Sequence, residues 1–177
     1  GESDTAAMAS LTAEAIGSLE SSILVLSTGI IGEFLPMETI TEGIRSAANQ
    51  LAADEESVMR AARGFMTTDT RPKLAGESFG KTPSGETYQM LGFAKGAAMI
   101  GPKLATMLGL IVTDAAITPE DAQRLIFQAC DLSFNCVSVD GHMSTNDTVL
   151  LLANGAAGEE PLAGKNLETF ETALMNT

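Results

Sequence analysis

The sequence has 177 residues, which is long enough for a folded domain with its own hydrophobic core. Ten Lys and Arg stand against 23 Asp and Glu, and the net charge of −13 argues against nucleic acid and anionic membranes as partners. With 45% hydrophobic and only 19% charged residues, the chain is not expected to be disordered.

The first third of the chain is predicted to be mainly helical. The segment 5–16 is rich in Ala and has apolar residues at helical spacing. Further helices are expected over 37–51, directly after a proline, and from Asp54 through 65. Between the first two helices, the apolar run 23–26 is bounded by serines and a glycine, which predicts a buried strand.

The rest of the chain mixes strands with helices. The segment 67–84 is rich in Thr, Pro and Gly, so it is expected to be a loop with room for an edge strand. Since strands and helices do not alternate strictly, we predict an α+β fold in which mixed sheets are covered by helices. Strands are expected over 88–93, 106–113 and 134–140. Helices are expected from the capping Thr118 to about 132, through the apolar run 149–154 behind a capping box at 144–147, and from about Pro161.

The cysteines and the histidine limit the chemistry. Cys130 and Cys136 are too few for a disulfide framework, and no secretory signal is visible, so we expect a cytoplasmic protein in a reducing compartment. No uncharged apolar run approaches the roughly 20 residues that a membrane-spanning helix needs. The single histidine, His142, excludes a His-rich metal site, and we expect no metal.

Four segments are candidates for chemistry, although each alone has a plain structural interpretation. Ser27–Gly32 ends in glycines that let backbone N–H groups face outward, as in an oxyanion hole, or form an ordinary turn. Met66–Thr70 is a hydroxyl cluster or a helix end with local turns. Lys95–Ile100 places a lysine among small residues, and Leu104–Leu108 places Thr106 where a β-branched strand residue would also fit.

Taken together, these segments resemble the bifunctional glutamate N-acetyltransferase/ornithine acetyltransferase family of arginine biosynthesis. The resemblance runs in one order along essentially the whole chain, which makes it specific although each motif alone is weak. It is carried by STGIIGEFLPME (27–38), MTTDTRPK (66–73), KGAAMIGPKLATML (95–108), TDAAI (113–117) and STNDTVLLLANG (144–155).

The resemblance implies a role for individual residues. Family members cut themselves before the Thr of the ATML motif, so the cleaved bond here is expected to be Ala105–Thr106. Thr106 then becomes the catalytic nucleophile and also contacts substrate. The family's oxyanion stabilisers fall on Thr28 and Gly29. Its substrate-binding threonine and lysine fall on Thr67 and Lys95.

The chemistry of threonine agrees with this assignment. A threonine hydroxyl is a weak nucleophile that needs a base, and the sequence offers no histidine with an obvious placement for that role. Cleavage before Thr106 frees an α-amino group, whose usual pKa of about 7.7–8.0 suits a base at working pH. The small Ala105 leaves the hydroxyl room to approach the carbonyl that it attacks.

The resemblance also implies the activity and assembly of the whole protein. It implies acetyl transfer from N-acetylornithine to glutamate through acetyl-Thr106, with acetyl-CoA as a second donor and no other cofactor. The segment 1–105 would be the end of an α chain and 106–177 the start of a β chain. The complete protein would contain two of each, and residues 1–177 would form one incomplete domain, an internal fragment.

Two departures from the family pattern and two alternatives remain. Lys103 stands where many members have a Pro-Asn-Met sequence, and His142 stands where an acid is frequent. The alternative enzyme is a self-cleaving amidohydrolase or aminopeptidase of similar architecture. The non-enzymatic alternative is a binding or structural domain, or an inactive fragment, in which Thr106 is only a strand residue.

Overall fold

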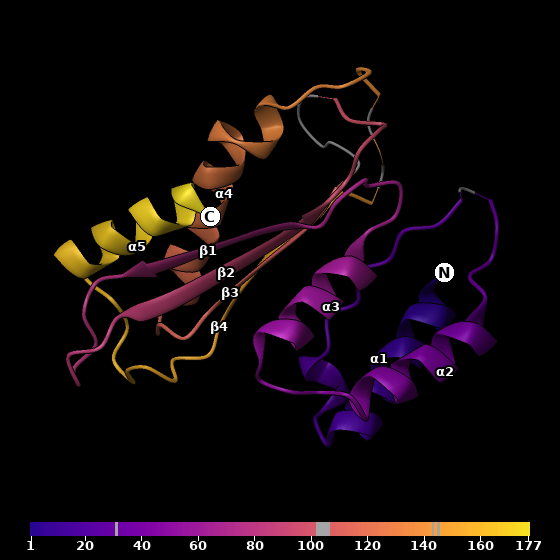
Figure 1. Ribbon diagram of the computed structural model, residues 1–177, viewed down its shortest axis with the longest axis horizontal. Coiled ribbons are helices and arrows are strands. Elements are labelled where there is room, and N and C mark those ends of the chain that lie inside the picture. Colours follow the sequence, from indigo (N-terminus) through magenta and orange to yellow (C-terminus); the bar gives the residue numbers. More distant parts are fainter. Residues whose placement is uncertain (31, 102–106, 143, 145) are drawn as a thin grey trace. The chain divides into compact units, whose positions relative to one another are not determined.

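The structure is a computed structural model that describes residues 1–30, 32–101, 107–142, 144 and 146–177 (Figure 1). It consists of two compact units, Gly1–Val58 and Met59–Thr177. The division falls within helix α3 (Glu55–Phe65). None of the helices in the described part of the chain is long and apolar enough to cross a membrane.

The first unit is helical, as its composition predicts. Helix α1 (Glu2–Ile16) ends at Gly17, whose φ of 68° is the left-handed conformation that closes many helices. A short 3-10 helix, η1 (Glu20–Ser22), follows, and α2 (Met37–Ala48) packs against α1.

The predicted strand over 23–26 is wrong. These residues have no regular structure, and Leu24 is 61% exposed. A strand needs a neighbour for its backbone N–H and C=O groups, and the strands that the structure describes all belong to the second unit. The helix predicted from Asp54 is confirmed, since the Asp54 carboxylate accepts a hydrogen bond from the amide of Ser57 at 2.7 Å.

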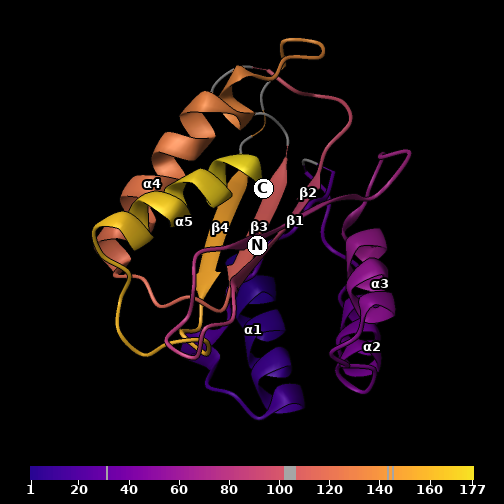
Figure 2. The same ribbon diagram turned by 60° about the vertical axis from the view of Figure 1, so that its left-hand side comes forward.

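The second unit is built on a four-stranded sheet (Figure 2). Its strands lie in chain order, with β1–β2 and β2–β3 antiparallel and β3–β4 parallel. The strands are β1 (Lys73–Phe79), β2 (Tyr88–Lys95), β3 (Leu108–Thr113) and β4 (Thr148–Ala153).

Two helices, α4 (Pro119–Leu132) and α5 (Lys165–Asn176), cover one face of this sheet (Figures 1 and 2). Helix α4 begins as predicted, because the Thr118 hydroxyl accepts a hydrogen bond from the Asp121 amide at 3.1 Å. Phe170 and Leu125, the most completely buried large side chains described, anchor α5 and α4 in a core shared with the strands. The predicted α+β fold of a mixed sheet and covering helices is confirmed.

Two elements of this unit differ from the prediction. The segment expected to be a strand over 134–140 contains a 3-10 turn, η2 (Phe134–Cys136), and then irregular chain. Amides of this chain converge on the Ile100 carbonyl, which a strand ladder would not allow. The helix expected through the apolar run 149–154, behind a capping box, is replaced by β4, because this short run pairs in parallel with β3.

Candidate functional site

One end of the sheet gathers four charged side chains from distant parts of the sequence. In the strand register, Lys95 at the end of β2 pairs with Leu108, and Leu108 pairs with Thr148 at the start of β4. Strand β1 also begins at this end. The charged sheet end, as we call it, comprises Asp69, Lys73, Lys95 and Asp147.

Asp69 organises the first part of this cluster. Its side chain is only 1% exposed and forms an ion pair with Lys73. Its carboxylate also accepts hydrogen bonds from the amides of Gly96 at 2.9 Å and Thr67 at 3.2 Å. Burial disfavours the charged carboxylate, but these hydrogen bonds outweigh burial and hold the pKa of Asp69 below its usual value. The MTTDT segment is thereby fixed to the end of β2.

Lys95 is a buried charge with unused hydrogen-bonding capacity. The residue is 3% exposed, and its ammonium makes no hydrogen bond to any residue that the structure describes. Burial lowers the pKa of Lys95, while the negative charges of Asp69 and Asp147 act against that shift. An ammonium whose donors are not taken by other described residues is suited to hold a carboxylate or a carbonyl oxygen of a ligand.

The negative charge of Asp147 acts on Lys95. Its carboxylate also binds the backbone just before β3. Its Oδ1 accepts a hydrogen bond from the amide of Met107 at 2.8 Å. Its Oδ2 is buried without a hydrogen-bond partner in the described part of the chain. Burial raises the pKa of Asp147, against the amides of Met107 and Ser144 and the charge of Lys95.

A third aspartate, Asp140, fixes the loop that follows Lys95. Its carboxylate accepts hydrogen bonds from the amides of Met99 at 2.8 Å and Ile100 at 3.0 Å. Gly101 lies so close to Gly141 that a Cβ there would be 2.9 Å from a backbone carbon. The chain is therefore anchored on both sides of residues 102–106, by Asp140 before them and by Asp147 after them.

The predicted site residues fall into three groups. Lys95 and Thr67 belong to one cluster, since Asp69 binds the amides of Thr67 and of Gly96, the residue after Lys95. Thr28 and Gly29 are exposed and belong to the first unit. Ala105 and Thr106 lie outside the described residues, and so does Lys103, where the sequence departs from the family pattern.

Sequence reasoning missed the part played by Asp69 and Asp147. Both lie inside motifs that it singled out, MTTDT and STNDT. In the sequence, these two motifs indicate a local turn and a helix cap, because carboxylates among Thr, Ser and Asn are typical of both. His142 is an exposed loop residue, its Nδ1 3.5 Å from an oxygen of Asp140.

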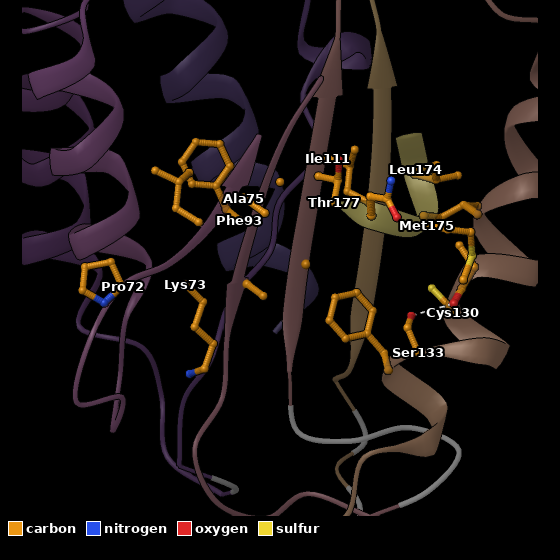
Figure 3. A pocket seen from close by; sticks show the side chains of 18 of the residues that line it. Pro72, Lys73, Ala75, Phe93, Ile111, Cys130, Ser133, Leu174, Met175 and Thr177 are labelled. Carbon is orange, nitrogen blue, oxygen red and sulfur yellow. Dashed lines mark hydrogen bonds between the residues drawn. The ribbon is translucent and has the colours of Figure 1, made fainter. Parts of the chain in front are cut away.

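A cavity of about 580 Å³ lies on the helix-covered face of the sheet (Figure 3). Its walls come from the strands, from α4 and from the C-terminal turn of α5. None of the predicted site residues that the structure describes lines it, whereas Lys73 of the charged sheet end does. Elsewhere among the described residues, no group of three or more His, Cys, Asp or Glu side chains is arranged to hold a metal ion.

Comparison with known proteins places this sequence in a family. The model of the ArgJ family matches residues 1–177. Among similar proteins, Arginine biosynthesis bifunctional protein ArgJ from Geobacter sulfurreducens is 48% identical over 175 residues, which is 99% of this chain and 44% of that protein. The mitochondrial protein of the same name from Neosartorya fischeri is 45% identical, over 99% of this chain and 39% of its own length. That from Meyerozyma guilliermondii is 46% identical, over 89% of this chain and 36% of its own length. The chain spans less than half the length of these relatives, yet the family model matches it from end to end, and it belongs to the ArgJ family.

Proposed function

We propose that the protein transfers an acetyl group from N-acetylornithine to glutamate, within arginine biosynthesis, through an acetyl-Thr106 intermediate. The observation that carries the proposal is the match of the ArgJ family model to all 177 residues. The names of the relatives, arginine biosynthesis bifunctional protein, support the pathway and a second activity. We assign that second activity to acetylglutamate synthesis with acetyl-CoA as the donor.

The proposed reaction begins with self-cleavage. The Thr106 hydroxyl attacks the carbonyl carbon of Ala105, the peptide C–N bond breaks, and an ester replaces the amide. Water then hydrolyses the ester, leaving a carboxylate on Ala105 and a free α-amino group on Thr106. That amine takes the proton from the hydroxyl in later turnovers, because its pKa is close to working pH.

Turnover is a two-step exchange at the same oxygen. The Thr106 hydroxyl attacks the acetyl carbonyl of N-acetylornithine, ornithine leaves as the amine, and acetyl-Thr106 remains. The amine of glutamate then attacks this ester and leaves as N-acetylglutamate. Thr28 and Gly29 would stabilise the oxyanion of each tetrahedral intermediate, a contribution of about 2.7–4 kcal/mol for each donor.

Lys95 and Thr67 would bind the substrate. The support from the structure is that Lys95 is 3% exposed, and its ammonium donates no hydrogen bond to another described residue. Asp69 fixes the backbone on both sides of this pair, at Thr67 and at Gly96, so their placement does not depend on a ligand.

The proposed assembly has two α chains, ending at Ala105, and two β chains, beginning at Thr106. No metal or cofactor is included, and neither nucleic acid nor a membrane is a partner. We propose a cytoplasmic location. The names of the fungal relatives include the word mitochondrial and that of the Geobacter relative names no compartment, so cell fractionation in the source organism is the test.

The test of the reaction is an exchange assay with the intact protein. N-acetylornithine labelled in the acetyl group is incubated with glutamate, and labelled N-acetylglutamate is expected together with an equal amount of ornithine. Labelled free acetate as the only product would show an amidohydrolase instead. An uncut and inactive intact protein would favour the binding-domain alternative.

A further inference from the structure

Lys95 and Asp147 lie in one row across the charged sheet end. Lys95 closes β2 and pairs with Leu108, the first residue of β3. Leu108 in turn pairs with Thr148, which directly follows Asp147. The two charges are therefore brought to the same end of the sheet by the strands on either side of β3.

Asp147 has one oxygen in use and one free. Oδ1 accepts the hydrogen bond from the Met107 amide, and Met107 is the residue that follows Thr106. Oδ2 is buried and has no hydrogen-bond partner among the described residues. A buried, unpartnered carboxylate oxygen is costly unless a charge or a ligand compensates it.

Of the two acids that act on Lys95, Asp69 is already neutralised by other groups. It is ion-paired with Lys73 and accepts two backbone amides. Asp147 has no other cation near it in the described structure, and its electrostatic interaction is with Lys95. Asp69 has the larger effect on Lys95 and Asp147 the smaller, but of the two acids it is Asp147 whose negative charge has no other described cation to pair with.

We propose that Asp147 is a positioning residue of the acetyl-transfer site, which fixes the Met107 backbone with one oxygen and keeps Lys95 charged with its negative charge. This inference rests on the proposed function for its catalytic meaning, but the coupling of Asp147 to Lys95 does not. The two parts can be separated by substitution, since the hydrogen bond needs an oxygen and the coupling needs a charge.

Asp147→Asn separates the two parts in the intact protein. The carboxamide oxygen can still accept the Met107 amide, but the negative charge is gone. Titration of isotope-labelled lysine Nζ by NMR, with the Lys95 signal assigned by its loss in Lys95→Gln, should show Lys95 losing its proton at lower pH than in the wild type. The matched control is Asp140→Asn, which removes a carboxylate that binds the Met99 and Ile100 amides but does not act on Lys95.

The activity should follow the same division. In Asp147→Asn, self-cleavage should proceed, while the loss of kcat/KM for acetyl transfer with rising pH should begin at a lower pH than in the wild type, because Lys95 loses its proton sooner. In Asp147→Ala, which also removes the Met107 hydrogen bond, cleavage should slow as well.

Two results would overturn the inference. One is an Asp147→Asn protein in which Lys95 titrates as in the wild type. The other is an Asp147→Asn protein that cleaves as slowly as Asp147→Ala. Failure of the wild type to transfer acetyl groups would instead refute the proposed function, and the lysine titration would still decide whether Asp147 controls Lys95.

Discussion

The carboxylate of Asp69 bridges the ammonium of Lys73, four residues later, and the amide of Gly96, the residue that directly follows β2. Lys73 also donates to the Gly96 carbonyl at 2.9 Å, so both backbone groups of this glycine are satisfied. This closed arrangement joins the start of β1 to the end of β2 at the point where Lys95 is placed.

Replacement of Asp69 should change both the stability and its dependence on pH. The pKa of Asp69 is lowered in the folded protein, so its contribution is complete above the unfolded value of about 4 and is lost as the pH falls through the folded value. We expect Asp69→Asn to lose about 1–2 kcal/mol at pH 7, since Lys73 is partly exposed and the pair is partly screened. Urea unfolding at pH 7 and pH 3 measures this, and a wild type that loses no more stability than the variant between these pH values would contradict it.

The close approach of Gly101 to Gly141 makes the loop before residues 102–106 sensitive to a single methyl group. A Cβ on Gly101 would meet backbone atoms of Gly141 and His142 at 2.9–3.1 Å, and backbone cannot move aside cheaply. Gly101→Ala should cost about 1–3 kcal/mol and slow self-cleavage. The control is Gly43→Ala in α2, where nothing lies within 4 Å, so no loss is expected. Equal thermal unfolding midpoints for the two variants would refute this account.

Lys95→Ala should impair substrate use without stopping self-cleavage. The substrate would lose its cationic partner, so kcat/KM for N-acetylornithine should fall by about 10- to 10²-fold, from the usual worth of a charged hydrogen bond. Lys165→Ala, at the exposed start of α5, removes an equal charge and should have no effect. The comparison uses steady-state kinetics of the two variants, and the intact mass of each shows whether it is cleaved. Identical kinetics would show that Lys95 has a structural role and does not bind substrate.

Thr106 should control two separable events through one hydroxyl. Thr106→Ala removes the oxygen, so the protein should remain uncut and inactive. Thr106→Ser keeps the oxygen but loses the methyl group that restricts χ1, so cleavage should persist while turnover falls. Intact mass and the exchange assay give both readouts. An alanine variant that still splits between residues 105 and 106, or still transfers acetyl groups, would disprove the mechanism.

Local signals predicted the helices well because their ends are encoded nearby. Thr118 and Pro119 start α4, and Asp54 caps α3. Strand β4 was mistaken for a helix because STND before an apolar run is typical of a capping box, and only pairing with the distant β3 makes it a strand. The run 23–26 failed for the opposite reason, since it has strand composition without a partner strand.

Only the site residues that belong to recognisable motifs could be predicted from the sequence. Lys95 and Thr67 are substrate-binding candidates that the sequence predicts, and the structure brings their segments together. Asp69 and Asp147 were not found as organisers, because each acts on the backbone amide of a residue far away in the sequence, Gly96 and Met107. An amide gives no sign in a sequence of which carboxylate will bind it.

The antiparallel register of β2 with β3 connects the segments on either side of the predicted cleavage bond, from Met90–Thr113 to Lys95–Leu108. Hydrolysis of Ala105–Thr106 would turn this hairpin into an interface between two polypeptides. The products would separate on a denaturing gel but migrate as one particle in gel filtration, because β2 of one product stays paired with β3 of the other. Expressed as two separate chains, 1–105 and the remainder would have to find this register by diffusion, whereas the uncut precursor forms it within one molecule.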